Sequence, residues 1–148
     1  MAESVAALGQ YLEALADTEL VIERTASSSG SLSRGERHGS WFIGVTWSTG
    51  GGIQRSAEIA LTNATALEDD RADAAFVSAR ASASTDAYWV SDMVYEQRRS
   101  VRRIDFIDLE NWLRAAIELA DSYTPAALTN AYDLGRVRGV SPFTSDNL

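Results

Sequence analysis

The sequence predicts an α+β domain, in which an antiparallel β-meander of about five strands carries an N-terminal helix and two C-terminal helices packed on one face. Apolar residues recur with helical spacing near both ends of the chain, and segments that alternate in polarity fill the middle. Strands that follow one another, without helices between them, favour an antiparallel sheet over a doubly wound parallel one. The 148 residues suit a single core. We assign residues 1–135 to one domain and 136–148 to a C-terminal arm.

The first expected elements are a helix and a strand. Val5, Leu8, Leu12 and Leu15 recur at three and four residues, which predicts an amphipathic helix over residues 3–16. Residues 19–25 (ELVIERT) are rich in β-branched side chains and alternate, so they are expected to form a strand. Residues 26–40 are polar and rich in serine and glycine, which indicates a long loop.

The middle of the chain predicts four further strands. Residues 41–48 and 53–62 alternate clearly, with Trp41, Ile43, Val45 and Trp47 on one face of the first segment and Ile53, Ala57, Ile59 and Leu61 on one face of the second. Thr49 and three glycines between them predict a hairpin turn. Residues 74–84 alternate small side chains and residues 87–98 alternate large ones, so both are expected in the same antiparallel sheet.

Two helices are expected to follow the sheet. Asp108 is a candidate N-cap for a helix whose apolar stripe comprises Leu109, Trp112, Leu113, Ala116, Ile117 and Ala120. Thr124 and Pro125 fit the cap and first position of a short helix over residues 125–134. The face of the sheet away from these helices must be solvated or bound to a partner.

The composition excludes several kinds of functional site. The chain has no cysteine and a single histidine, His38, so cysteine-based zinc sites, disulfides, thiol nucleophiles and multi-histidine metal centres are ruled out. No motif for phosphate binding or for a calcium loop is present. We therefore expect no catalytic residues, no metal site and no cofactor.

Charge is concentrated in one basic block on an acidic chain. The net charge is −8, and all thirteen basic residues are arginines. An acidic protein repels polyanions and anionic membranes on average, so any nucleic-acid binding would depend on the block. The residues predicted to contact a partner are this block and two nearby aromatics: Arg98, Arg99, Arg102, Arg103, Tyr95 and Trp89. In the opposing interpretation, the arginines pair with the chain's own acids, among them Glu96, Asp105 and Asp108.

The expected function is that of a non-enzymatic protein-interaction module. Small size, acidity and the lack of a catalytic constellation suit an inhibitor of immunity type, or an assembly component such as a phage structural protein. The partner would be another protein or a second copy of the chain, and the location cytoplasmic or virion-associated, without membrane association. The alternative is a nucleic-acid binder that uses residues 98–103, with Tyr95 and Trp89 as stacking groups. A third hypothesis is a small enzyme whose carboxylates meet only in the fold.

Overall fold

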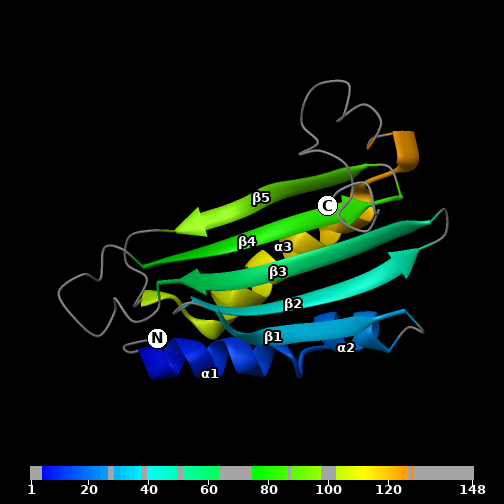
Figure 1. Ribbon diagram of the computed structural model, residues 1–148. Helices are drawn as coiled ribbons and strands as arrows, with labels where there is room; N and C mark the ends of the chain where they lie inside the picture. The colour runs from blue at the N-terminus through cyan, green and yellow to red at the C-terminus, as the bar shows by residue number, and fades with distance from the viewer. Residues whose placement is uncertain are drawn as a thin grey trace.

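A computed structural model describes residues 5–26, 29–37, 40–49, 52–63, 75–86, 88–97, 103–126 and 128. Two helices come first, five strands follow, and a long helix closes the described order (Figure 1). The bounds are α1 (Val5–Leu15), α2 (Glu19–Thr25), β1 (Ser31–Arg37), β2 (Ser40–Thr49), β3 (Ile53–Thr62), β4 (Phe76–Ser84), β5 (Trp89–Gln97) and α3 (Phe106–Ser122). The predicted α+β class is confirmed.

The five strands form one antiparallel meander in the order β1-β2-β3-β4-β5. The expected hairpin joins β2 to β3, with Thr49 paired to Ile53 and Trp41 paired to Leu61. Gly52 ends its turn at a φ of 75°, which glycine adopts without steric cost. The β1–β2 register is regular throughout, whereas the β4–β5 register shifts between Ala79 and Arg80. The two edges of the sheet therefore differ.

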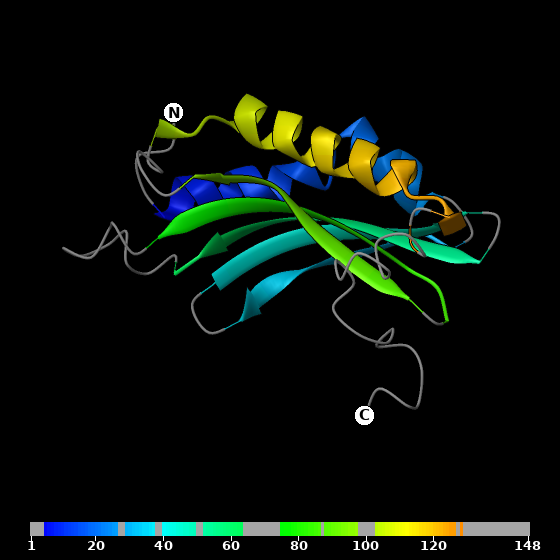
Figure 2. The ribbon, with the colours of Figure 1, turned by 90° about the horizontal axis from the view of Figure 1, so that it is seen from above.

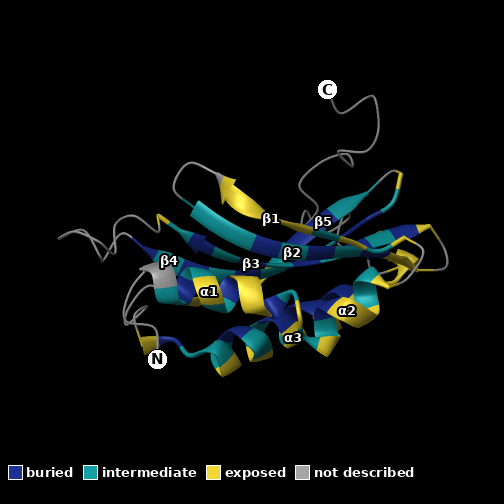
Figure 3. Ribbon diagram, turned by 90° about the horizontal axis from the view of Figure 1, so that it is seen from below, coloured by how far each residue is buried: buried dark blue, intermediate teal, exposed yellow. Residues whose placement is uncertain are grey.

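All three helices lie on one face of the sheet (Figure 2). Alternate residues of β2 and β3 are buried beneath them, which is why dark bands alternate along these strands in Figure 3. The predicted inward sets on both strands are confirmed, apart from Trp41, which is only partly buried against the core. We call the opposite side, which none of the described helices covers, the open face.

The helices α1 and α3 contribute a further part of the core. Leu8, Leu12 and Leu15 of α1 are buried, as the periodicity predicted. The predicted stripe of α3 is also confirmed: Leu109, Leu113, Ala116, Ile117 and Ala120 are buried, and Trp112 packs partly buried against the core. Sequence periodicity therefore identified both helix faces that hold the sheet.

Helix α3 begins earlier than predicted. Its N-cap is Asp105, with extended backbone angles, and not Asp108. Asp108 lies three residues further on, where its carboxylate accepts a 3.0 Å hydrogen bond from the Asp105 backbone N–H. An acidic side chain at this position satisfies an otherwise unpaired backbone donor and faces the positive end of the helix dipole.

Two predictions near the N-terminus are wrong. Residues 19–25 form helix α2 and not a strand, because only Val21 is buried there while Ile22 remains 50% exposed. One buried side chain among seven residues suits a short helix docked on one side, and Glu19 and Arg24 complement its dipole. The polar stretch 26–40 is not one loop, because it contains strand β1 over residues 31–37.

Part of the predicted C-terminal structure lies outside the described residues. Pro125, Ala126 and Leu128 are helical, and Leu128 is fully buried, consistent with the start of the expected last helix. Residues 129–148, which include the rest of that helix and the predicted arm, are among those the structure does not describe.

Candidate functional site

A groove of about 820 Å³ lies between α1 and the β1–β2 hairpin, and we call it the α1–β1 groove. One wall is the outward side of α1 and the other is the second half of β1 with the start of β2. The lining residues are Gly9, Gln10, Leu12, Glu13, Ala14, Asp17, Arg34, Gly35, Glu36, Trp41 and Phe42.

The floor of the groove is apolar and tightly packed. Trp41 lies against α1 at Gly9, where an added Cβ would be 2.5 Å from the ring atom Cζ3. Glycine inside a helix costs about 1 kcal/mol relative to alanine. At this position it admits the indole ring, which packs partly buried beside the buried Leu12. The glycine is therefore explained by close packing of α1 on β2.

The rim of the groove is charged and predominantly acidic. Arg34 of β1 reaches across to Glu13 of α1, with a 3.0 Å separation between Nη1 and Oε2. Both side chains are more than half exposed, so this bridge contributes little to stability. Asp17 and Glu36 are exposed and line the same groove. The described lining residues include three carboxylates and one guanidinium, a formal charge of −2.

Strand β1 is an edge strand that presents its outer side to solvent. In the described sheet it pairs only with β2, and residues 33–36 are all exposed. The strand carries no proline and its seven paired residues run without a bulge, although these are common means of protecting an edge. At the opposite edge, the β4–β5 ladder contains an irregularity that locally disrupts pairing.

The helices extend past the β1 edge. In Figure 1, α1 and α2 lie beyond β1 on the side away from β2, whereas α3 lies behind β3 and β4. A further strand added at β1 would therefore run over α1. Its inward side chains would enter the α1–β1 groove, because Arg34 and Glu36 project from the helix-covered face of β1, in register with Ile43 and Trp41.

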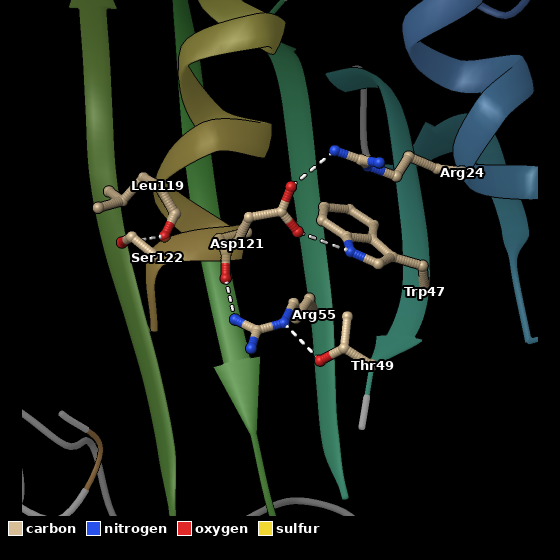
Figure 4. A network of polar contacts seen from close by, with 8 residues as sticks. Arg24, Trp47, Thr49, Arg55, Leu119, Asp121 and Ser122 are labelled. Carbon is tan, nitrogen blue, oxygen red and sulfur yellow. Dashed lines mark hydrogen bonds and ion pairs between the residues drawn. The ribbon is translucent and has the colours of Figure 1, made fainter. Parts of the chain in front are cut away.

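A second polar cluster ties the other ends of the helices to the sheet (Figure 4). The Asp121 carboxylate of α3 accepts hydrogen bonds from the Trp47 indole at 3.0 Å and from Arg24 of α2 at 2.6 Å. The Arg24 guanidinium also lies 5.1 Å from the centre of the Trp47 ring system, a cation–π contact. Arg55, only 7% exposed, donates to the Thr49 hydroxyl at 2.9 Å and to the Ala120 carbonyl. These contacts hold α2 and α3 on the sheet, so we assign the cluster a structural role.

The open face is polar and its central side chains are hydrogen-bonded to one another. Glu58 and Arg80 face each other across β3 and β4. Arg80 donates to the Ser91 hydroxyl at 3.2 Å, and Ser82 donates to the same oxygen at 3.1 Å. The two concavities found on this face are small, about 150 and 280 Å³.

The structure separates the two aromatics that we predicted to contact a partner. Tyr95 lies on the helix-covered face, where it stacks on Trp112 with ring centroids 4.0 Å apart and donates to Gln97 at 2.6 Å. Trp89 pairs with Ser84 and projects to the open face, where it lines the smaller concavity. The two rings therefore share no surface.

Only one arginine of the predicted block falls in the described part of the chain. Arg103 is exposed just before α3. Arg98, Arg99 and Arg102 lie outside the described residues, as does His38. The contact of this block with a partner, and its pairing with the chain's own acids, both remain predictions.

The described residues hold no cluster of three or more histidine, cysteine, aspartate or glutamate side chains placed to bind a metal ion. In the same part of the chain, no helix combines the length and the apolar character needed to cross a membrane. Comparisons with models of protein families, with curated proteins and with solved structures found no match for this chain.

Proposed function

We propose that this protein is a non-enzymatic interaction module that binds an extended segment of another protein along strand β1, above the α1–β1 groove. The observation that carries the proposal is the regular, exposed edge of β1 next to a groove floored by Leu12 and Trp41. Addition of a strand to such an edge gives affinity through backbone hydrogen bonds. Pockets for alternate side chains then give specificity.

The chemistry of the groove supports binding over catalysis. Among the described residues, its lining includes no histidine, serine or threonine, and its three described carboxylates all belong to exposed residues. Enzymes tune a general acid or base by burial and by specific neighbours, and these carboxylates are open to water. The proposal therefore retains the interaction module over the enzyme hypothesis.

Selection from a random peptide library displayed on phage tests this proposal on the full-length chain. Ala14 is exposed and lines the groove, so Ala14→Trp fills it without disturbing the core. Asn111→Trp is the matched control, because Asn111 is also exposed on a helix, α3, and does not line the groove. Circular dichroism and thermal melting confirm that both variants fold.

We expect the selected peptides to lose about tenfold or more in affinity for the Ala14→Trp variant and to bind the Asn111→Trp variant normally. Gln10→Trp, at a second exposed position on the same wall, should repeat the loss. Peptides that bind all these variants equally would rule out the groove as the binding site.

An inhibitor and an assembly component, the two roles expected of such a module, differ in stoichiometry. An inhibitor forms a closed complex of defined mass with one partner. An assembly component forms rings or layers with itself or with a few neighbours. Light scattering measures the mass of the purified chain, alone and with a partner whose binding requires the α1–β1 groove, and so separates the two roles.

A further inference from the structure

We infer that the segment bound along β1 is basic, with arginine or lysine at alternate positions. This inference rests on the proposed function and specifies the chemistry of its partner. Three features support it: the charge of the groove, the dipole at the C-terminal end of α1, and the alternation of side chains in a strand added at β1.

The charges around the groove favour a cationic partner. Glu13, which is bridged to Arg34, and Asp17 lie on one wall, and the exposed Glu36 lies on the other. An inward side chain of an added strand would pass between these walls. A guanidinium or ammonium there would face carboxylates on both sides, whereas an acidic side chain would be repelled.

The C-terminal end of α1 adds to the negative potential. No basic residue occupies its last turn, and Asp17 lies two residues beyond its end. The end of a helix carries a partial negative charge, which cations within one turn stabilise. Arg34, bridged to Glu13, already places one guanidinium beside this turn, and a basic partner segment lying over the groove would add a second cation.

Strand geometry sets the spacing. Successive side chains of a strand project to opposite faces, so only every second residue of the bound segment enters the groove. The intervening residues project to the side of the open face, where Ser33 and Thr46 lie near this edge together with Phe42. Alternating basic and small polar residues therefore match both sides of the added strand.

A fluorescently labelled seven-residue peptide of alternating arginine and threonine is the probe, and anisotropy with the full-length chain measures its affinity. We expect it to bind, with affinity that falls as salt rises. The same peptide with glutamate in place of arginine should not bind. A permuted peptide with its arginines contiguous should bind several-fold more weakly.

Backbone pairing is tested by methylating peptide nitrogens. The N–H groups of alternate residues point to the same edge of a strand, so methylation of the arginine nitrogens blocks one edge and methylation of the threonine nitrogens blocks the other. We expect one of these two peptides to bind about tenfold more weakly than the other. Equal affinities would show that charge alone holds the peptide, which overturns the strand geometry.

Two isosteric double variants test whether the carboxylates of the groove, and not those elsewhere on the protein, attract the basic peptide. Asp17→Asn with Glu36→Gln removes two carboxylates from the groove, and Glu23→Gln with Glu118→Gln removes two exposed carboxylates elsewhere, so the net charge of both variants is the same. The first should weaken binding about three- to tenfold and the second should have little effect. If both variants lose peptide affinity equally, binding depends on the overall charge of the protein and not on the groove, which would contradict the inference.

The failure of this inference is distinguishable from failure of the proposed function. Suppose that the selected peptides whose affinity falls in the Ala14→Trp variant are neutral or acidic. The inference of a basic partner is then wrong, while the proposed strand-binding module stands. If the alternating peptide shows no binding at millimolar concentration and no selected peptide responds to Ala14→Trp, both are overturned.

Discussion

At the residue scale, the fold depends on a few side chains whose contacts sequence inspection does not anticipate. Asp121 is the clearest example, since one carboxylate holds an indole of β2 and a guanidinium of α2 at the end of α3. Nothing in the local sequence marks Asp121 as different from the exposed Glu118 nearby. Its role arises from residues 74 and 97 positions away in the chain.

Replacement of Asp121 by alanine should lower the free energy of unfolding by about 1–2 kcal/mol, because the Trp47 N–H loses its acceptor. Asp121→Asn, which keeps an acceptor for Trp47, should cost less. Glu118→Ala is the control and should stay within about 0.5 kcal/mol. Urea denaturation gives these values, and equal stability of the Asp121→Ala and Glu118→Ala variants would contradict the assigned role.

Gly9 offers a second test at this scale. Alanine in a helix interior is normally about 1 kcal/mol more favourable than glycine. Here the Cβ would meet the Trp41 ring at 2.5 Å, so we expect Gly9→Ala to destabilise the chain instead. In a Trp41→Leu background the same substitution should regain its favourable sign. A double-mutant cycle measured by thermal melting decides the matter, and identical effects in both backgrounds would refute the contact.

At the element scale, sequence patterns identified the elements whose side chains alternate between core and solvent. The strands β2 and β3, their glycine turn, and the apolar faces of α1 and α3 were all predictable, because burial imposes periodicity on the sequence. Helix α2 was missed because Val21 and Ile22 favour a strand by propensity. In the fold, the buried Val21, the partly buried Leu20 and the contact of Arg24 with Asp121 dock this segment as a helix. Strand β1 was missed because an exposed edge strand imposes almost no apolar pattern.

The candidate site depended on this missed strand. The α1–β1 groove brings residues 9–17 together with residues 34–42. Most of the second segment lies in residues 26–40, which were predicted to form a loop. One usable signal was present, since Leu32, Arg34 and Glu36 alternate with Ser31, Ser33 and Gly35 as a strand would. Their low hydrophobicity concealed it.

The start of α3 is the element where a local rule applies most directly. Asp108→Ala removes the acceptor of the Asp105 N–H and should cost about 1 kcal/mol. Asp108→Asn keeps a side-chain oxygen but loses the charge that favours the helix N-terminus, so its cost should be smaller. Far-UV circular dichroism during urea denaturation measures both. A neutral Asp108→Ala variant would show that the cap contributes nothing.

At the scale of the whole molecule, the described helices leave one face of the sheet uncovered, and β1 and β5 form its two edges. The open face has hydrogen-bonded polar side chains and small concavities, whereas the β1 edge combines an exposed strand that pairs in the described sheet only with β2, an apolar floor and an acidic rim. This asymmetry is why the proposed binding surface is the edge. The proposed binding surface is therefore not the arginine block that was predicted from the sequence. It is an acidic groove that would receive a basic segment.

Hydrogen exchange of backbone amides, with and without the alternating arginine–threonine peptide, tests this central claim most directly. The outward amides of an edge strand exchange quickly, and pairing with a new strand protects them. We predict that peptide binding slows exchange in β1 over residues 31–37 and in the adjacent part of α1, while β4 and β5 remain unchanged. Protection confined to β4 and β5, or binding without protection of β1, would contradict the account.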